Sequence, residues 1–336
     1  MLIDTPIQPS LSPRTTAAAA GPDLSFARCL PPAAVHKAAA GEVLLTDTAR
    51  LSEDRFAVAA LWPRDRFLHH QGQDAPGDPL LLVETVRQSL IHLSHTYYGI
   101  PRGHPFLLST LFLDTGPRGL PGWRGAPLPV TLDVTCTPTT TAPRRFGRAL
   151  GAVLHVDGEP LGRAGMRWEV LDPRRYQLIR GRTARTPAGP ATREAPLPRP
   201  LDPREVGYAH AEHVLLAEGG ERTGRDWWLR LNRRHPVLFD HESDHIPGMV
   251  LLEAFRQAAH AAELPVRPSL SAVAASYGAF GELDVPVRIS ARPVRDAHHA
   301  AGPAVLEVTA VQGDAVLAAA RFGDATRFPS TTGAAS

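Results

Sequence analysis

Residues 80–88 read LLLVETVRQ, and residues 249–257 read MVLLEAFRQ. Each copy is an apolar run that ends in Glu-x-x-Arg-Gln, and the glutamates at 84 and 253 lie 253 − 84 = 169 positions apart, half the 336-residue chain. A glutamate and an arginine at this spacing share one face of a helix. Charges on so apolar a helix are costly unless they are paired or used. The repeat therefore predicts two equivalent sites in a duplicated fold.

The chain follows the same order around each copy of this helix. An opening segment (35–45 or 206–216) precedes a strand (55–61 or 226–231), a loop and then the helix. Alternating or apolar runs predict further strands over 106–112, 129–136, 148–156 and 165–171, and then over 278–283, 285–291, 305–311 and 315–322. One long helix wrapped by antiparallel strands, twice over, predicts an α+β architecture.

Composition predicts where the chain divides. Residues 181–203 are rich in proline and poor in large apolar side chains, which is typical of a linker. We therefore predict an N-terminal domain over 28–180 and a C-terminal domain over 204–325, with loose tails at 1–27 and 326–336. The first tail lacks the basic and apolar regions of a signal peptide.

The overall composition excludes several classes of protein. The chain is 43% hydrophobic and 21% charged, as in soluble globular proteins, and no apolar run reaches the roughly 18 residues of a membrane span. A net charge of +2 gives no electrostatic case for nucleic acid. Cys29 and Cys136, the only cysteines, suit a reduced cytoplasm. Lys37 is the only lysine among 36 basic residues, a bias that we attribute to a GC-rich genome.

The loop before the second helix, residues 235–248, holds three histidines and two aspartates in HPVLFDHESDHIPG. These residues permit a metal site, but a loop does not hold His241 and His245 on one face as an H-E-x-x-H helix does. A second reading has the Asp-His pairs cap the loop by hydrogen bonding. The third, which we favour, gives at least one of these histidines a catalytic or substrate-orienting role.

The two helices begin differently. Pro247 and Gly248 open the second helix, where the glycine N–H at the positive end of the helix dipole could hold a thioester oxyanion. Asp78 and Pro79 open the first helix, and proline has no N–H to donate. The sequence therefore predicts two unequal sites.

The second helix, with Pro247-Gly248, Glu253-Ala254 and Gln257, resembles the P-G-x-x-x-x-E-A-x-x-Q helix of hotdog-fold β-hydroxyacyl-ACP dehydratases, from which Arg256 departs. The duplicated Glu-x-x-Arg-Gln is similar to that of the A-factor biosynthesis (AfsA-like) family. Residues 35–37 (VHK), 78–81 (DPLL) and 235–241 (HPVLFDH) extend the likeness over about residues 30 to 325.

This resemblance implies a double hotdog fold and an acyltransferase. No cofactor is assigned, because the sequence holds no G-x-G-x-x-G or P-loop motif. Such an acyltransferase moves a β-ketoacyl group from acyl carrier protein to dihydroxyacetone phosphate, on the way to γ-butyrolactone, butenolide or furan signals. It marks Glu84, Glu253 and Arg256 as functional. It also implies that a helix glutamate meets the loop of the opposite repeat. A fused pseudo-dimer would suit a monomer, and a homodimer stays open.

The chemistry of the residues agrees with that outline. Burial is expected to raise the pKa of a helix glutamate so that it accepts the hydroxyl proton, and arginine suits a phosphate. The predicted catalytic groups are Glu84, Glu253, His241, His245 and Gly248. Predicted substrate-binding groups are Arg256, Arg87, Gln88, Gln257 and Asp240, and no metal is assigned. His36 is expected to be a buried, hydrogen-bonded histidine.

Two alternatives stay open at this level. A thioesterase or dehydratase could act on the same acyl carrier, although acyl hydrolysis needs no arginine in each helix. A non-catalytic protein that senses an acyl or lactone ligand is the other alternative. The length of the acyl chain does not follow from the sequence.

Overall fold

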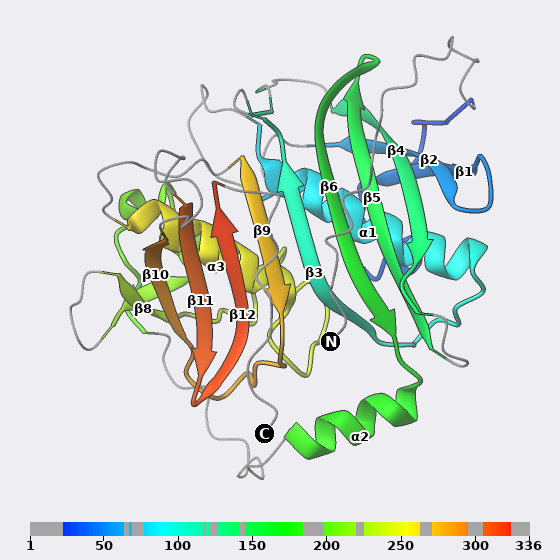
Figure 1. The fold of residues 1–336 in the computed structure, drawn as a ribbon. Coiled ribbons are helices and arrows are strands. Elements are labelled where there is room, and N and C mark those ends of the chain that lie inside the picture. Colours follow the sequence, from blue (N-terminus) through cyan, green and yellow to red (C-terminus); the bar gives the residue numbers. More distant parts are fainter. Residues whose placement is uncertain are drawn as a thin grey trace.

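One antiparallel sheet runs through both halves of the protein in the computed structural model (Figure 1). The structure describes residues 23–63, 67–68, 77–116, 119–120, 122, 127–140, 145–183, 198–219, 225–262, 271–294 and 305–323. Within these ranges the sheet has 12 strands in the order β1-β2-β4-β5-β6-β3-β9-β12-β11-β10-β8-β7. The second half of this order repeats the first half in reverse, so the two repeats are related by a pseudo-twofold axis between β3 and β9.

Each repeat contributes six of these strands. The first repeat supplies β1 (Leu45–Arg50), β2 (Arg55–Trp62), β3 (Phe106–Asp114), β4 (Leu128–Pro138), β5 (Phe146–Val156) and β6 (Glu159–Val170). The second supplies β7 (Leu216–Glu218), β8 (Asp226–Leu229), β9 (Ala272–Tyr277), β10 (Arg288–Val294), β11 (Val305–Gln312) and β12 (Ala315–Phe322). The sheet is continuous because β3 pairs with β9, for example Leu111 with Ala275.

The two predicted helices lie on the same face of this sheet, behind the strands in Figure 1. They are α1 (Pro79–Tyr97) and α3 (Gly248–Ala261). Both bury residues on nearly all sides, as expected of an apolar helix enclosed by its own repeat. Asp78 caps α1 by accepting a 3.0 Å hydrogen bond from the Leu80 N–H. The predicted α+β double hotdog architecture is confirmed.

One predicted strand is wrong. Residues 278–283 form a loop, and the strand is the preceding β9, with the sequence AVAASY. Alanine is a poor strand former, so the local pattern is weak here. Pairing with β3 on one side and β12 on the other supplies the stability that local preference lacks. The other predicted strands agree with observed ones to within a few residues, except that β6 begins at Glu159 and β10 extends to Val294.

A third helix, α2 (Pro173–Thr183), extends into the predicted linker. It contacts the second repeat, where Tyr176 donates a 2.7 Å hydrogen bond to Asp244 and Arg180 forms a 2.6 Å ion pair with Glu282. Residues 184–197 of the predicted linker lie outside the described residues, as do residues 1–22 and 324–336 of the predicted tails. Within the described ranges, no helix has the length and apolar character needed to cross a membrane.

The centre of the first repeat contains a paired glycine site that offers a matched test of packing. Gly165 on β6 lies opposite Gly151 on β5. A Cβ at Gly165 would overlap the Phe112 ring and lie 2.6 Å from the Leu150 carbonyl oxygen, whereas a Cβ at Gly151 would meet nothing within 4 Å.

We therefore expect Gly165→Ala to lower the free energy of unfolding by about 1–3 kcal/mol, because the backbone of β5 cannot yield without strain. Gly151→Ala is the control and should change it by less than about 1 kcal/mol. Urea unfolding of both variants measures the difference. Equal stabilities would show that the contact at Gly165 relaxes freely.

Candidate active site

The glutamines of the two motifs make the same hydrogen bonds in both repeats. Gln88 Oε1 accepts from the Leu44 N–H at 2.9 Å, and Gln257 Oε1 accepts from the Leu215 N–H at 2.8 Å. Each Nε2 also donates to a backbone carbonyl and, at 2.9 Å, to the motif glutamate. The glutamines thus hold the opening segment and the glutamate in place. Their side chains are occupied within the protein, although substrate binding is the role predicted for them.

The arginines pair with the glutamates of their own helix, as the spacing predicts. Arg87 donates to Glu84 through Nε and Nη2, each at 2.8 Å. Arg256 Nη2 lies 2.6 Å from Glu253 Oε2. The contact between Arg256 and Glu253 Oε2 is an ion pair but not a hydrogen bond, because Glu253 Oε2 has no hydrogen-bond partner among the described residues.

Residues of both repeats meet at the motif of the first helix. Lys37 Nζ lies 3.2 Å from Glu84 Oε1 and 3.7 Å from Asp240 Oδ2. Asp240 comes from the loop before α3, and its other oxygen lies 2.7 Å from His241 Nδ1. We call Lys37, Glu84, Arg87, Asp240 and His241 the first centre. The predicted pairing of a helix glutamate with the opposite loop is present here.

The motif of the second helix meets a different set of residues. Arg256 Nη1 donates to Asp78 Oδ1 at 2.6 Å, and Arg256 Nη2 donates to the Tyr208 hydroxyl at 2.6 Å. That hydroxyl donates in turn to Glu253 Oε1. We call Asp78, Tyr208, Glu253 and Arg256 the second centre. Asp78 belongs to the first repeat, so this centre is also shared between the repeats.

The two centres differ in the direction of the glutamate pKa shifts. Burial alone would raise the pKa of Glu84, but Arg87 and Lys37 outweigh burial and hold this pKa well below its usual range. Burial does raise the pKa of Glu253, because Arg256 only partly offsets it and Asp78 adds a second negative charge. The sequence predicts a raised pKa for both glutamates. That prediction is wrong for Glu84, since Lys37 provides a second cation that the motif does not reveal.

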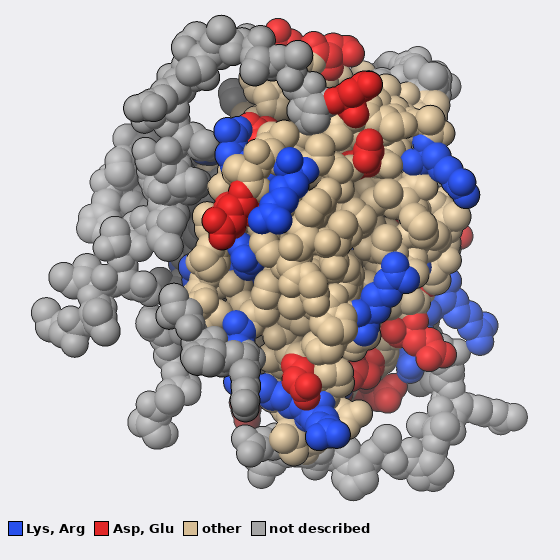
Figure 2. Space-filling model, turned by 90° about the vertical axis from the view of Figure 1, so that its right-hand side faces the viewer, with Lys and Arg blue, Asp and Glu red and all other residues tan. Residues whose placement is uncertain are grey.

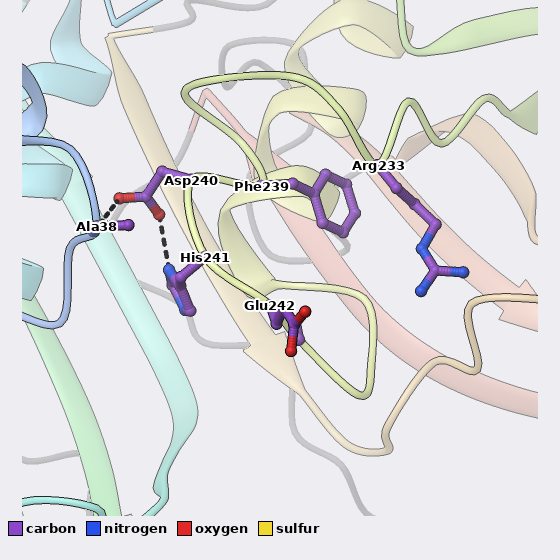
Figure 3. A pocket seen from close by; sticks show the side chains of 7 residues that line it. Ala38, Arg233, Phe239, Asp240, His241 and Glu242 are labelled. Atoms are coloured by element: carbon purple, nitrogen blue, oxygen red, sulfur yellow. Dashed lines mark hydrogen bonds and ion pairs between the residues drawn. The ribbon is translucent and has the colours of Figure 1, made fainter.

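The first centre borders a hollow of about 520 Å³ on the protein surface. Figure 3 shows the Asp240 carboxylate between Ala38 and His241 at one side of this hollow, with Phe239, Glu242 and Arg233 along the rest of its wall. The His241 side chain is 50% exposed. The second centre is more enclosed, because the Asp78 and Glu253 side chains are 0% exposed. A small molecule can therefore reach the edge of the first centre through this hollow.

Two residues of the predicted catalytic set lie apart from these contacts. His245 bonds Asp244 at 2.7 Å and stacks edge-on against Phe280, beside α2. Its role as a catalytic group therefore has no geometric support, because the loop turns it towards the helix that follows β6. Gly248 begins α3, and no contact to either centre is found for it among the described residues. The oxyanion role of Gly248 stays a prediction.

Three partners in these centres are not in the predicted set. They are Lys37, Asp78 and Tyr208. Lys37 carries a signal in the sequence, because it is the only lysine in a chain where arginine serves everywhere else. A lone lysine in so arginine-rich a chain is the signal by which this position could have been found, since the two side chains are not interchangeable. Asp78 and Tyr208 carry no comparable signal. No group of three potential metal ligands lies together among the described residues.

Comparison with known proteins adds the following findings. A family model described as the A-factor biosynthesis hotdog domain matches residues 18–172 and 190–324. A 2-oxo-3-(phosphooxy)propyl 3-oxoalkanoate synthase of Streptomyces virginiae is 37% identical over 293 residues, covering 86% of this chain and 95% of that protein. A protein of the same name from Streptomyces griseus is 36% identical over 67% of this chain and 72% of its own length. Among solved structures, the 12:0-ACP thioesterase from Umbellularia californica gives a TM-score of 0.47 at 10% identity, covering 79% of this chain and 92% of that chain.

Proposed function

Since the chain belongs to the A-factor biosynthesis hotdog family, we propose that it is an acyltransferase that forms a 2-oxo-3-(phosphooxy)propyl 3-oxoalkanoate. This product is the ester of a β-keto acid with the free hydroxyl of dihydroxyacetone phosphate. The donor is a β-ketoacyl thioester of acyl carrier protein, and the ester leads to γ-butyrolactone-type signals. The enzyme acts in the cytoplasm, which suits the two free cysteines found among the described residues.

The first centre is the reaction centre in this proposal, and the observation that carries it is the free side of Arg87. Glu84 occupies Nε and Nη2 of this guanidinium, and Nη1 has no partner among the described residues. The Arg87 side chain is 19% exposed. An arginine that is oriented by a carboxylate and keeps donors free is suited to a phosphate. Arg256, the predicted phosphate ligand, is instead engaged by three partners.

Transfer needs a base, an oxyanion donor and exclusion of water. The acceptor hydroxyl loses its proton as its oxygen attacks the thioester carbon, the C–S bond breaks, and the thiolate takes up a proton. Glu84 stays ionised and holds Arg87 and Lys37 in position, so a histidine of the centre is the better base. The Gly248 N–H is our candidate for the oxyanion contact. Water must be kept out, since it would hydrolyse the thioester.

The face of the molecule shown in Figure 2 gives no reason to assign nucleic acid as a partner. Figure 2, which views the β1 and β2 side of the molecule, shows basic and acidic side chains interspersed over a largely uncharged surface. A binding site for nucleic acid would gather basic residues on one face. The proposed macromolecular partner is the acyl carrier protein alone, and a fused pseudo-dimer suits a monomer, with a homodimer as the other arrangement.

Mass spectrometry of the intact products tests the proposal. Purified protein is mixed with a β-ketoacyl-ACP and dihydroxyacetone phosphate, and each substrate is omitted in turn. We expect a phosphorylated ester that requires both substrates. Free β-keto acid formed without the acceptor would identify a thioesterase, and loss of water from a β-hydroxyacyl-ACP would identify a dehydratase. Tight retention of an acyl or lactone ligand without turnover would identify a binding protein.

The same assay with unphosphorylated dihydroxyacetone tests the role of the phosphate. A site built to bond a group rejects the analogue that lacks it, so we expect kcat/KM to fall by roughly 10²-fold or more. Glycerol 3-phosphate, which keeps the phosphate but lacks the ketone, is the matched acceptor for comparison. Equal rates with and without the phosphate would contradict the proposed role of Arg87.

A further inference from the structure

The backbone of His36 adopts an unusual conformation beside the first centre. Its φ of 52° lies in the left-handed region, which non-glycine residues rarely adopt. The only other described non-glycine residue with a positive φ is Asp157, which lies in the tight β5–β6 hairpin turn where such angles are normal. His36 follows the 3-10 helix Pro32–Ala34 and closes the turn in which the Lys37 N–H donates to the Pro32 carbonyl at 3.0 Å. A left-handed residue that ends a helix is usually glycine, so the histidine here is the unusual feature.

The matching position in the second repeat is a glycine. Val35-His36-Lys37 corresponds to Val206-Gly207-Tyr208, and Gly207 has a φ of 78°. The fold therefore requires a positive φ here in both repeats, and glycine meets that requirement without strain. A Cβ at Gly207 would also lie only 3.1 Å from the ring of His260, which is tighter than most such contacts. The first repeat thus keeps a histidine where the fold itself favours glycine.

The hydrogen bonds of His36 determine which ring nitrogen carries the proton. His95 Nδ1 lies 2.7 Å from the Ile100 carbonyl oxygen, which only accepts, so Nδ1 of His95 is the protonated nitrogen. His95 Nε2 then has the lone pair and accepts from His36 Nε2, 2.9 Å away. In the neutral ring this leaves a lone pair on His36 Nδ1. The tautomers are inferred from the network of acceptors rather than observed.

The free nitrogen of His36 is available to a substrate. His36 Nδ1 has no hydrogen-bond partner among the described residues. It is not one of the fully buried polar atoms that lack a partner, so it keeps some exposure to solvent. The ring lies near Arg87 and His241, whose charges both act on it. Phe106 covers the ring edge-on at 5.3 Å between centroids. His36 directly precedes Lys37, whose Nζ lies 3.2 Å from Glu84 Oε1 in the first centre. The imidazole therefore lies beside the first centre, with Phe106 covering part of the ring.

We propose that His36 is the general base of the acyl transfer, and that His95 is the positioning residue that fixes its tautomer. His36 Nδ1 accepts the proton of the acceptor hydroxyl as that oxygen attacks the thioester carbon. The C–S bond breaks, and the same nitrogen returns the proton to the leaving thiolate, so that no other reactant is needed. This inference rests on the proposed function and names the base that the proposed reaction requires.

His241 is the rival base, and its surroundings suit it less. Its Nδ1 is directed to Asp240, which also binds Lys37 and the Ala38 N–H, and half of the side chain is exposed. A base open to water would activate water and hydrolyse the thioester. We assign His241 to the entrance of the centre.

Electrostatics connects the base to the phosphate of the acceptor. Burial lowers the pKa of His36 to about 4, and the repulsion between its protonated ring and a protonated His95 or Arg87 adds to this effect. A phosphate bound to Arg87 would offset this positive field and raise the pKa of His36 towards its ordinary value. The base would then gain strength when the acceptor is present, and the thioester would be protected in its absence.

His36→Gly is the decisive variant, because glycine is what the second repeat uses at this position. The variant should stay folded, with an unchanged circular dichroism spectrum, while kcat for ester formation falls by roughly 10²- to 10⁴-fold. KM should change little, and added imidazole should restore part of the activity. His36→Asn tolerates the left-handed backbone without supplying a base, and it should behave in the same way.

Two further measurements separate this inference from the proposed function. His95→Asn should lower kcat without rescue by imidazole. Nitrogen NMR of histidine-labelled wild-type protein, which needs no turnover, should show His36 protonated at Nε2 and His95 at Nδ1. Two activity results would overturn the assignment. One is full activity of His36→Gly under conditions where the wild type forms the ester. The other is rescue by imidazole of a His241→Gly variant but not of His36→Gly. A His36 ring protonated at Nδ1 would also overturn it, whatever reaction the wild type catalyses.

Discussion

Replacing Arg256 by glutamine should lower the free energy of unfolding by about 3–5 kcal/mol. Arg256 is the cation for both Asp78 and Glu253, whose side chains are 0% exposed. Without it two carboxylates remain buried with no counter-charge. Removing one partner of a buried ion pair is costly because the other charge is left unpaired. Urea unfolding at pH 7 measures the loss.

The pH dependence of this loss has a defined sign. In the wild type, Arg256 outweighs burial and lowers the pKa of Asp78, so this group stabilises the fold above its unfolded pKa of about 4, and the contribution is lost as the pH falls. In the variant burial dominates and the pKa of Asp78 rises. Acidification then protonates the buried Asp78 carboxylate and raises the free energy of unfolding of the variant. The gap between wild type and variant should therefore narrow from pH 7 to about pH 4.5.

Arg145→Gln is the control for this experiment. Arg145 pairs with Glu169 at the same distance of 2.6 Å, but these side chains are 42% and 37% exposed. Water screens such a pair, so its loss should lower the free energy of unfolding far less than the loss of Arg256 does. Equal losses in the two variants would show that Arg256 does not neutralise the buried carboxylates.

Replacing Arg87 by glutamine should impair catalysis rather than folding. We expect kcat/KM for dihydroxyacetone phosphate to fall by roughly 10²- to 10³-fold, which corresponds to about 3–4 kcal/mol of transition-state binding. The fold should suffer less than in Arg256→Gln, because Lys37 still neutralises Glu84. Steady-state kinetics with the phosphorylated and unphosphorylated acceptors measures the effect.

The two acceptors distinguish a phosphate ligand from a general structural role. If Arg87 binds the phosphate, the loss should be largest for dihydroxyacetone phosphate, and the variant should nearly lose its preference for that acceptor. A loss of the same size for both acceptors would contradict the assignment. Arg256→Gln, assayed under conditions where it is folded, should keep its preference for the phosphorylated acceptor. A rise in its KM for that acceptor alone would instead support phosphate binding by Arg256, the role predicted from the sequence.

Much of the fold follows from residues that lie close together in the chain. The period of an apolar helix and the alternation of strands are local, so both helices and most strands are predictable. The alanine-rich β9 is not, because its stability comes from β3 and β12 on either side. The cross-repeat character of the site was implied only by resemblance to a family. Tyr208 carries no pattern in the sequence, and Asp78 could be recognised only as part of the family likeness and as the start of a helix, not as a partner of Arg256.

Two Glu-x-x-Arg-Gln helices follow from the amino-acid sequence alone, and so does the pairing of each glutamate with an arginine, since a spacing of three residues places both on one face of any helix. The partners that complete each pair depend on how the two repeats pack together. Asp240 bonds Ala38 from 202 positions away, and Asp78 bonds Arg256 from 178 positions away. These partners set the opposite pKa shifts of Glu84 and Glu253. The reason is physical: burial and charge depend on neighbours in space, and the pseudo-twofold packing of the two repeats brings those neighbours together.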